Sequence, residues 1–100
     1  MFLILYIARS SKNYCNSIAG GFVPTILRLL SWRFHFYSDE GDEPPHIHVD
    51  TGDGECKFWL EPIRLARSRN VSAVELRRIE GVVYEQQQFF KEKWHEFFNC

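Results

Sequence analysis

The sequence predicts an α+β fold: a small twisted antiparallel sheet of about four strands, covered on one face by a long C-terminal α-helix. Two observations lead to this prediction. Apolar and polar residues alternate in several short segments between residues 25 and 60, as in half-buried strands. Apolar residues then recur at helical spacing over residues 73–97. A chain of 100 residues is long enough for one domain with one core.

A β-hairpin is predicted over residues 46–60. Alternate side chains of a strand lie on opposite faces, so Ile47 and Val49 face the same side. The second strand contributes Cys56, Phe58 and Leu60 to this apolar face. The opposite face carries the polar residues and one tryptophan: His46, His48, Asp50, Glu55, Lys57, Trp59 and Glu61.

The turn of this hairpin is expected at Asp53-Gly54, a pair typical of the central positions of a two-residue turn. Such a turn sets the cross-strand pairs. The expected pairs are Asp50 with Lys57, which would form an ion pair, His48 with Trp59, and His46 with Glu61.

Two strands are expected before the hairpin, over residues 25–30 and 32–37, joined by a tight connection at Leu30-Ser31. An acidic loop over residues 39–43 and two prolines follow them. After the hairpin, residues 63–70 are compatible with a short edge strand or with an irregular crossing.

The helix has a clear start signal. Ser72 and Glu75 form a capping box, in which each side chain bonds the other residue's backbone N–H. Gly81 lies inside the helix and either allows close approach to the sheet or has no special role. The stripe expected to cover the apolar face of the sheet consists of Leu76, Ile79, Val83, Phe90, Trp94 and Phe97.

Residues 1–22 show no regular period and are expected to be a poorly ordered extension of the domain formed by residues 23–100. No apolar run is long enough to cross a bilayer, and the positive charges follow the apolar residues 2–8, unlike those of a signal peptide. The three cysteines are widely spaced and fit a reducing compartment. A cytoplasmic protein without a membrane partner is therefore expected.

His46 and His48 are the candidate catalytic residues. At positions i and i+2 of a strand they point the same way, so they could act as acid and base on a phosphodiester or bind a metal. Alternatively, they are binding residues or plain solvated side chains. The absence of a Cys–His ligand spacing argues against a metal, and no cofactor is expected.

The candidate binding residues share the polar face of the hairpin or the basic segment that follows it: Asp50, Lys57, Trp59, Glu61, Arg64, Arg67 and Arg77. Trp59 either contacts a partner or packs under residues 63–70. The segment 64–78 holds five arginines and one acidic residue, which fits phosphate contacts or a solvated face. Because residues 39–43 are equally acidic and the net charge is −1, separate charged lobes that meet a protein partner are favoured.

Residues 23–100 resemble the bacterial family called domain of unknown function 4160 (DUF4160). The most specific part of the resemblance is Pro-Pro-His-Ile-His-Val at residues 44–49. Further similar segments are 23–28, 32–38, 54–60, 64–67, 76–80 and 94–96. Members commonly begin with Met-Pro-Thr-Ile, so the resemblance implies that Val23 is the native start and that residues 1–22 are a start-site misassignment.

The resemblance further implies a small protein encoded beside the gene of a second one (domain of unknown function 2442, DUF2442), in a two-gene module of toxin–antitoxin type. It assigns no catalytic residues. The first hypothesis is therefore a partner-binding component without enzymatic activity. The alternative is a metal-independent ribonuclease-like toxin that uses His46 and His48. A weaker alternative is a regulator that binds RNA or DNA through residues 64–78.

Overall fold

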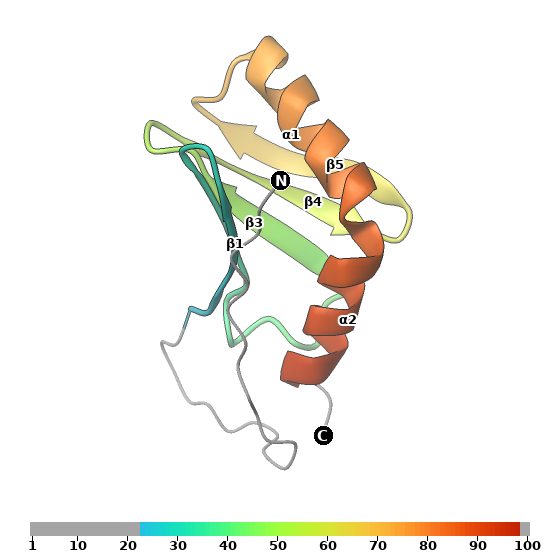
Figure 1. Cartoon of the computed structure of the whole chain (residues 1–100). Coiled ribbons are helices and arrows are strands. Elements are labelled where there is room, and N and C mark those ends of the chain that lie inside the picture. Colours follow the sequence, from blue (N-terminus) through green and yellow to red (C-terminus); the bar gives the residue numbers. More distant parts are fainter. Residues whose placement is uncertain (1–22, 99–100) are drawn as a thin grey trace.

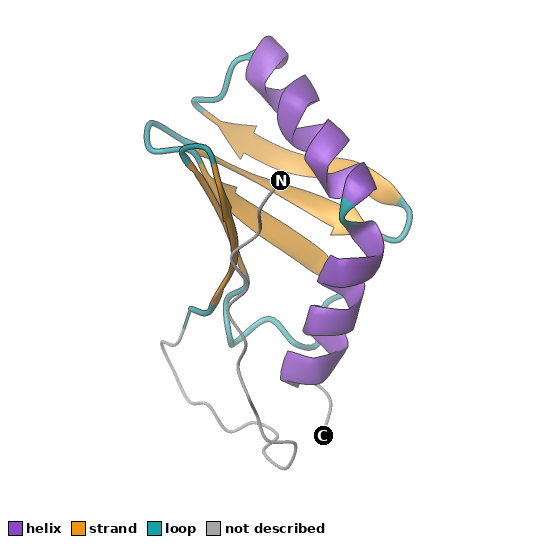
Figure 2. Ribbon diagram, viewed as in Figure 1, coloured by secondary structure: helices purple, strands orange, loops and turns teal. Residues whose placement is uncertain are grey.

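A computed structural model describes residues 23–98 of the chain. The expected N-terminal extension, residues 1–22, lies outside the described residues. Five strands precede two helices (Figures 1 and 2). In chain order they are β1 (Thr25–Leu29), β2 (Trp32–His35), β3 (His46–Asp50), β4 (Glu55–Leu60), β5 (Ile63–Arg69), α1 (Ala73–Glu85) and α2 (Gln87–Phe98).

The strands form one antiparallel sheet in the order β1-β2-β3-β4-β5. The α+β prediction is thus confirmed, with five strands in place of about four. Residues 63–69, for which the sequence allowed a strand or a crossing, form the edge strand β5. Its pairing with β4 shifts register between Lys57 and Phe58, as at a β-bulge. Figure 1 shows the two helices lying across one side of the sheet.

The predicted turn of the β3–β4 hairpin is wrong by one residue. The central residues are Gly52 and Asp53, because Thr51 closes the turn by donating its N–H to the Gly54 carbonyl at 2.9 Å. Gly52 has φ +97°, which fits a glycine at the first central position of a hairpin turn. The Gly54 N–H also donates to the Thr51 hydroxyl at 3.0 Å, so the threonine side chain stabilises this turn in place of the expected one.

The register is consequently shifted by two residues. The observed pairs are Asp50 with Glu55, His48 with Lys57, and His46 with Trp59. A shift of two residues leaves every side chain on its predicted face, because the period of a strand is two. The division into an apolar and a polar face therefore holds, whereas the predicted opposed pairs do not.

The core lies between the apolar face of the sheet and the helices. The ring of Phe34 on β2 stacks on Phe90 of α2 with centroids 5.4 Å apart. The helices bury four residues of the predicted stripe, while Leu76 and Phe97 are half-buried beside them. The fully or nearly fully buried apolar residues are Ile26, Leu27, Trp32, Phe34, Phe36, Ile47, Val49, Cys56, Phe58, Leu60, Ile79, Val83, Phe90 and Trp94.

The predicted single helix is in fact two helices, separated at Gln86. This residue has φ −106° and ψ 17°, although its N–H still donates to the Val82 carbonyl at 2.8 Å. The next side chain, Gln87, donates from Nε2 to the carbonyl of Leu60 at 2.7 Å, which ties the junction to the end of β4. Neither α1 nor α2 has the length and apolar character needed to cross a membrane.

The helix start is confirmed at Ser72, whose hydroxyl accepts from the Glu75 N–H at 3.1 Å. The reciprocal half of the predicted capping box is replaced by another contact. The Glu75 carboxylate accepts from Trp32 Nε1 at 2.9 Å, so it links the first turn of α1 to β2.

We expect opposite effects from alanine at two glycines. A Cβ on Gly54 would overlap the Arg69 carbonyl oxygen, a backbone atom that cannot move without displacing β5. Gly54→Ala should therefore lower the free energy of unfolding by at least about 2 kcal/mol. Gly81 is exposed and has open space around its Cβ position. Gly81→Ala should therefore raise the free energy of unfolding by about 0.5–1 kcal/mol. Urea unfolding of the full chain measures both, and equal effects would contradict this account.

Candidate functional site

The polar face of the hairpin is more covered than the sequence predicted. His46 and His48 are 0% and 3% exposed, and Lys57 is also buried. The loop between β2 and β3, residues 36–45, supplies the groups that contact them. His46 and His48 are therefore not plain solvated side chains, one of the alternatives that the sequence left open. Buried imidazoles require hydrogen-bond partners, and this loop provides them.

Glu40, His46 and His48 form what we call the histidine–glutamate cluster. Oε1 of Glu40 lies 2.7 Å from Nε2 of His46 and 2.7 Å from Nε2 of His48. The other ring nitrogen of His46, Nδ1, donates to the carbonyl of Pro44 at 2.9 Å. It also lies 3.6 Å from Oε1 of Glu43. One carboxylate oxygen thus bridges two imidazoles that β3 presents on the same side.

The environment of the cluster shifts two of its pKa values. Burial lowers the pKa of His48, and this effect outweighs the opposing hydrogen bond to Glu40. Burial raises the pKa of Glu40, but its contacts with His48 and His46 outweigh burial, so the net shift is downward. Glu40 is thus held as a carboxylate, and His48 favours its neutral form.

A third buried histidine lies beside the cluster. The ring of His35 on β2 stacks on His48 with centroids 5.6 Å apart, and its Nδ1 bonds the Arg33 carbonyl at 3.3 Å. Its Nε2 is buried and has no hydrogen-bond partner among residues 23–98. Burial, with a smaller contribution from the positive charge of Arg33, lowers the pKa of His35 to about 4, so this ring is neutral at pH 7.

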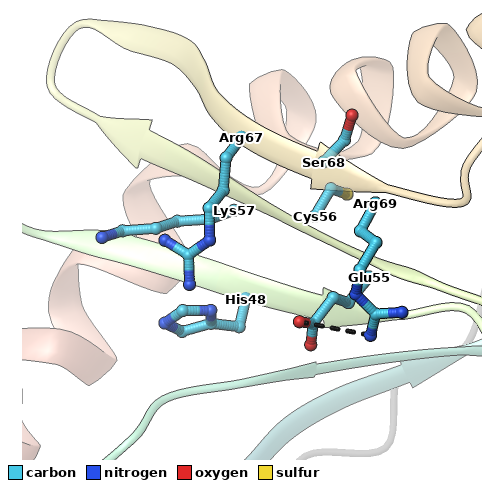
Figure 3. Close-up of a pocket in the computed structure, with 7 residues that line it drawn as sticks. All are labelled: His48, Glu55, Cys56, Lys57, Arg67, Ser68 and Arg69. Atoms are coloured by element: carbon cyan, nitrogen blue, oxygen red, sulfur yellow. Dashed lines mark ion pairs between the residues drawn. The ribbon is translucent and has the colours of Figure 1, made fainter.

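A hollow of about 300 Å³, which we call the basic pocket, opens beside His48 (Figure 3). Lys57, Arg67 and Arg69 line it and outnumber its single acidic residue, Glu55. Nη2 of Arg69 lies 3.5 Å from Oε2 of Glu55, an ion pair drawn as a dashed line in Figure 3. The complete lining is His48, Glu55, Cys56, Lys57, Arg67, Ser68 and Arg69.

Two of the basic side chains at this pocket have acidic partners, and one does not. Lys57 donates to Glu43 at 2.8 Å, and its ammonium lies 4.5 Å from the ring centroid of Trp59. Arg67 has no ion pair or side-chain hydrogen bond within residues 23–98. Figure 3 shows its guanidinium extending across the pocket toward His48. The pocket therefore presents an uncompensated cation suited to a carboxylate or phosphate.

The structure brings some predicted site residues together and separates others. His46, His48, Lys57, Trp59 and Arg67 share the polar face of β3, β4 and β5. Trp59 is half-buried there, with its ring 5.6 Å from that of His46. It therefore lies within this face rather than fully exposed.

The remaining predicted site residues belong neither to the cluster nor to the lining of the basic pocket. Oδ2 of Asp50 lies 3.9 Å from Nη2 of Arg33 on β2. The predicted ion pair between Asp50 and Lys57 is therefore wrong. The shifted hairpin register is the physical reason. Glu61 pairs with Lys91 of α2 at 3.1 Å. Arg64 is exposed on β5, directly opposite Trp59 of β4. Arg77 is exposed on α1, on the side of the sheet that the helices cover.

Sequence reasoning missed Glu40 and Glu43 as site residues and treated the acidic loop as a separate charged lobe. The available signal was their position, a few residues before Pro44 and His46, from which a short loop can fold back. Among the described residues, Glu40, His46 and His48 form the group whose donor atoms, all within 4.8 Å of one another, could hold a metal ion. The basic pocket could hold an anion.

The comparisons with known proteins identify a family. The sequence model of the family described as Domain of unknown function (DUF4160) matches residues 31–95, which include the cluster, the basic pocket and most of both helices. The comparisons with curated proteins and with solved structures returned no match.

His35 should make stability fall in mild acid. Its pKa is about 4 in the folded chain and about 6.5 when unfolded, so from pH 6.5 downward the unfolded state takes up the proton first. This difference should cost on the order of 3 kcal/mol of unfolding free energy between pH 7 and pH 4. Denaturant titrations of the wild type and His35→Phe across this range should show a shallower loss in the variant. His95→Gln, at an exposed histidine, is the control, and equal pH slopes for the wild type and His35→Phe would contradict the assignment.

Proposed function

The chain belongs to the DUF4160 family, and on this premise we propose that it is the partner-binding component of a two-gene module of toxin–antitoxin type. Its docking surface comprises the basic pocket and the outer edge of β5. The partner is the small protein encoded beside it, of the DUF2442 type, and it contributes an acidic segment. We propose that the protein binds this partner without enzymatic turnover, in the cytoplasm of a bacterium.

The proposal rests mainly on Arg67, which lacks an acidic partner among residues 23–98. Its guanidinium is exposed at the basic pocket and has no acidic partner in residues 23–98, whereas Lys57 and Arg69 are paired. A guanidinium can bind a carboxylate through two parallel hydrogen bonds, which fixes the orientation of the bound group. An aspartate or glutamate of a partner would supply this carboxylate.

The edge strand β5 supports the same surface. It is seven residues long, and no strand among the described residues pairs with its outer edge. A free edge can accept a strand of another protein through backbone hydrogen bonds. The exposed arginines along β5 disfavour pairing between two copies of this strand and favour an acidic partner strand.

The mixture of charges favours a protein partner over RNA or DNA. Glu43 and Glu55 neutralise Lys57 and Arg69, so the basic pocket is not a continuous stripe of cations. Arg77 and Arg78 lie on α1 and do not line this pocket. Nucleic-acid surfaces usually present several unpaired cations along the phosphate backbone. A regulator that binds nucleic acid through residues 64–78 has less support from this arrangement.

The ribonuclease alternative also has less support than partner binding. An acid–base pair must meet the substrate directly. His46 is fully buried, and its ring nitrogens face Pro44 and Glu40. A phosphodiester would have to displace the loop that carries Glu40 before His46 and His48 could act on it.

The test is co-expression of the full chain with the protein encoded beside it, followed by size-exclusion chromatography with light scattering. We expect a one-to-one complex whose absorbance ratio indicates no nucleic acid. Arg67→Glu should weaken this complex by about tenfold or more, because it places a like charge opposite the acidic segment. Arg78→Glu is the matched control, since it makes the same charge change on the exposed surface of α1.

A protein that elutes alone at micromolar concentration would contradict the proposal. Purification with bound RNA would also contradict it and would favour the regulator or the ribonuclease. Equal weakening by both variants would show that net charge, rather than the basic pocket, determines binding.

A further inference from the structure

The histidine–glutamate cluster has an unusual arrangement of hydrogen-bond acceptors. Nδ1 of His46 faces the Pro44 carbonyl, which can only accept, so this nitrogen carries a proton. Nε2 of the same ring faces the Glu40 carboxylate, which also only accepts. A neutral imidazole has one N–H and cannot serve both contacts. With Nδ1 donating to Pro44, a metal cation bound at Nε2 would satisfy the second contact.

The same carboxylate oxygen also lies 2.7 Å from Nε2 of His48. Three potential metal ligands thus converge, two from alternate positions of β3 and one from the loop that covers it. The Nδ1–H···O=C bond of His46 is the kind of contact that orients metal-binding histidines and leaves Nε2 free to coordinate.

We propose that Glu40 Oε1, His46 Nε2 and His48 Nε2 bind a divalent transition-metal ion of the Zn²⁺ class. Two histidines and one carboxylate are a known ligand set for zinc, with a fourth position left for water or another ligand. With metal–ligand distances near 2.0–2.2 Å, tetrahedral ligands lie about 3.3 Å apart. The observed separations of 2.7 Å from Glu40 to each histidine would widen by roughly 0.6 Å, within the reach of side-chain rotation.

The surroundings suit a metal site. Aromatic rings shield the imidazoles from water: the centroid of Trp94 lies 4.8 Å from that of His46, and Tyr37 lies 4.5 Å from His48. The neighbouring cation, Lys57, is compensated by Glu43 at 2.8 Å. Glu40 is the most exposed ligand, with 21% of its side chain accessible, and provides the route of entry.

The experiment titrates chelator-stripped full chain with Zn²⁺ by calorimetry and counts the metal retained after desalting. We expect one equivalent per chain and a melting temperature that rises with Zn²⁺. Glu40→Gln keeps the side-chain size but weakens coordination. It should lower affinity at least about 100-fold, since loss of a group that only orients a ligand already costs 10–100-fold. His95→Gln, at an exposed histidine of α2, should bind as the wild type does.

A second variant, His48→Gln, and circular dichroism separate loss of the ligand from loss of the fold. Co²⁺ provides a spectroscopic readout, with visible bands of a nitrogen–oxygen site and no thiolate charge-transfer band. A thiolate band would assign the metal to cysteines and overturn the proposal. Failure of the wild type to bind one equivalent would overturn it as well, as would Glu40→Gln and His48→Gln variants that are folded and bind as tightly as the wild type.

Discussion

Burial of the central strand β3 on both faces is the constraint on which the rest of this structure depends. On one face Ile47 and Val49 are completely covered by the core. On the other face His46 and His48 are almost equally buried. Strands buried on both faces usually carry apolar residues on both, because buried polar groups need partners. Here the partners are a carboxylate and a backbone carbonyl, and the loop before β3 must fold back to supply them.

That loop is held at several points. A Cβ on Gly41 would lie 2.5 Å from the ring of Phe98, so the loop packs directly on the end of α2. The Pro45 carbonyl accepts from the Leu60 N–H at 3.0 Å, and Glu43 pairs with Lys57. The hairpin, the loop and the last turn of α2 therefore position Glu40 together. The candidate site is for this reason part of the folding unit rather than an addition to its surface.

The charged side chains serve two purposes: some pair with other residues inside the molecule, and others stay exposed on its surface. Glu40 and Glu43 are engaged with His46, His48 and Lys57, so much of the acidic loop acts inside the molecule. The arginines of β5 remain exposed, with Arg67 directed across the basic pocket. His48 belongs to both the cluster and the lining of this pocket. A ligand at one of these places would therefore contact a residue that helps to build the other.

The local features of the fold could be predicted because their signals are local. The alternation of residues 32–37 and 46–50 specifies which side chains share a face, and Ser72 specifies where α1 begins. The family resemblance likewise rested on short motifs such as residues 44–49. The hairpin register was not determined in the same way. Both Asp53-Gly54 and Gly52-Asp53 are acceptable turns, and the hydroxyl of Thr51 stabilises the second.

The sequence by itself thus determined the α+β class, the division of the hairpin into two faces and the helical stripe. Only the tertiary structure decided that the polar face of β3 is buried, that Glu40 bridges the two histidines and that Gln86 interrupts the helix. The physical reason is distance along the chain. Periodicity acts through neighbouring residues, whereas the partner of a buried imidazole or of a helix-junction side chain depends on where a separate segment comes to lie.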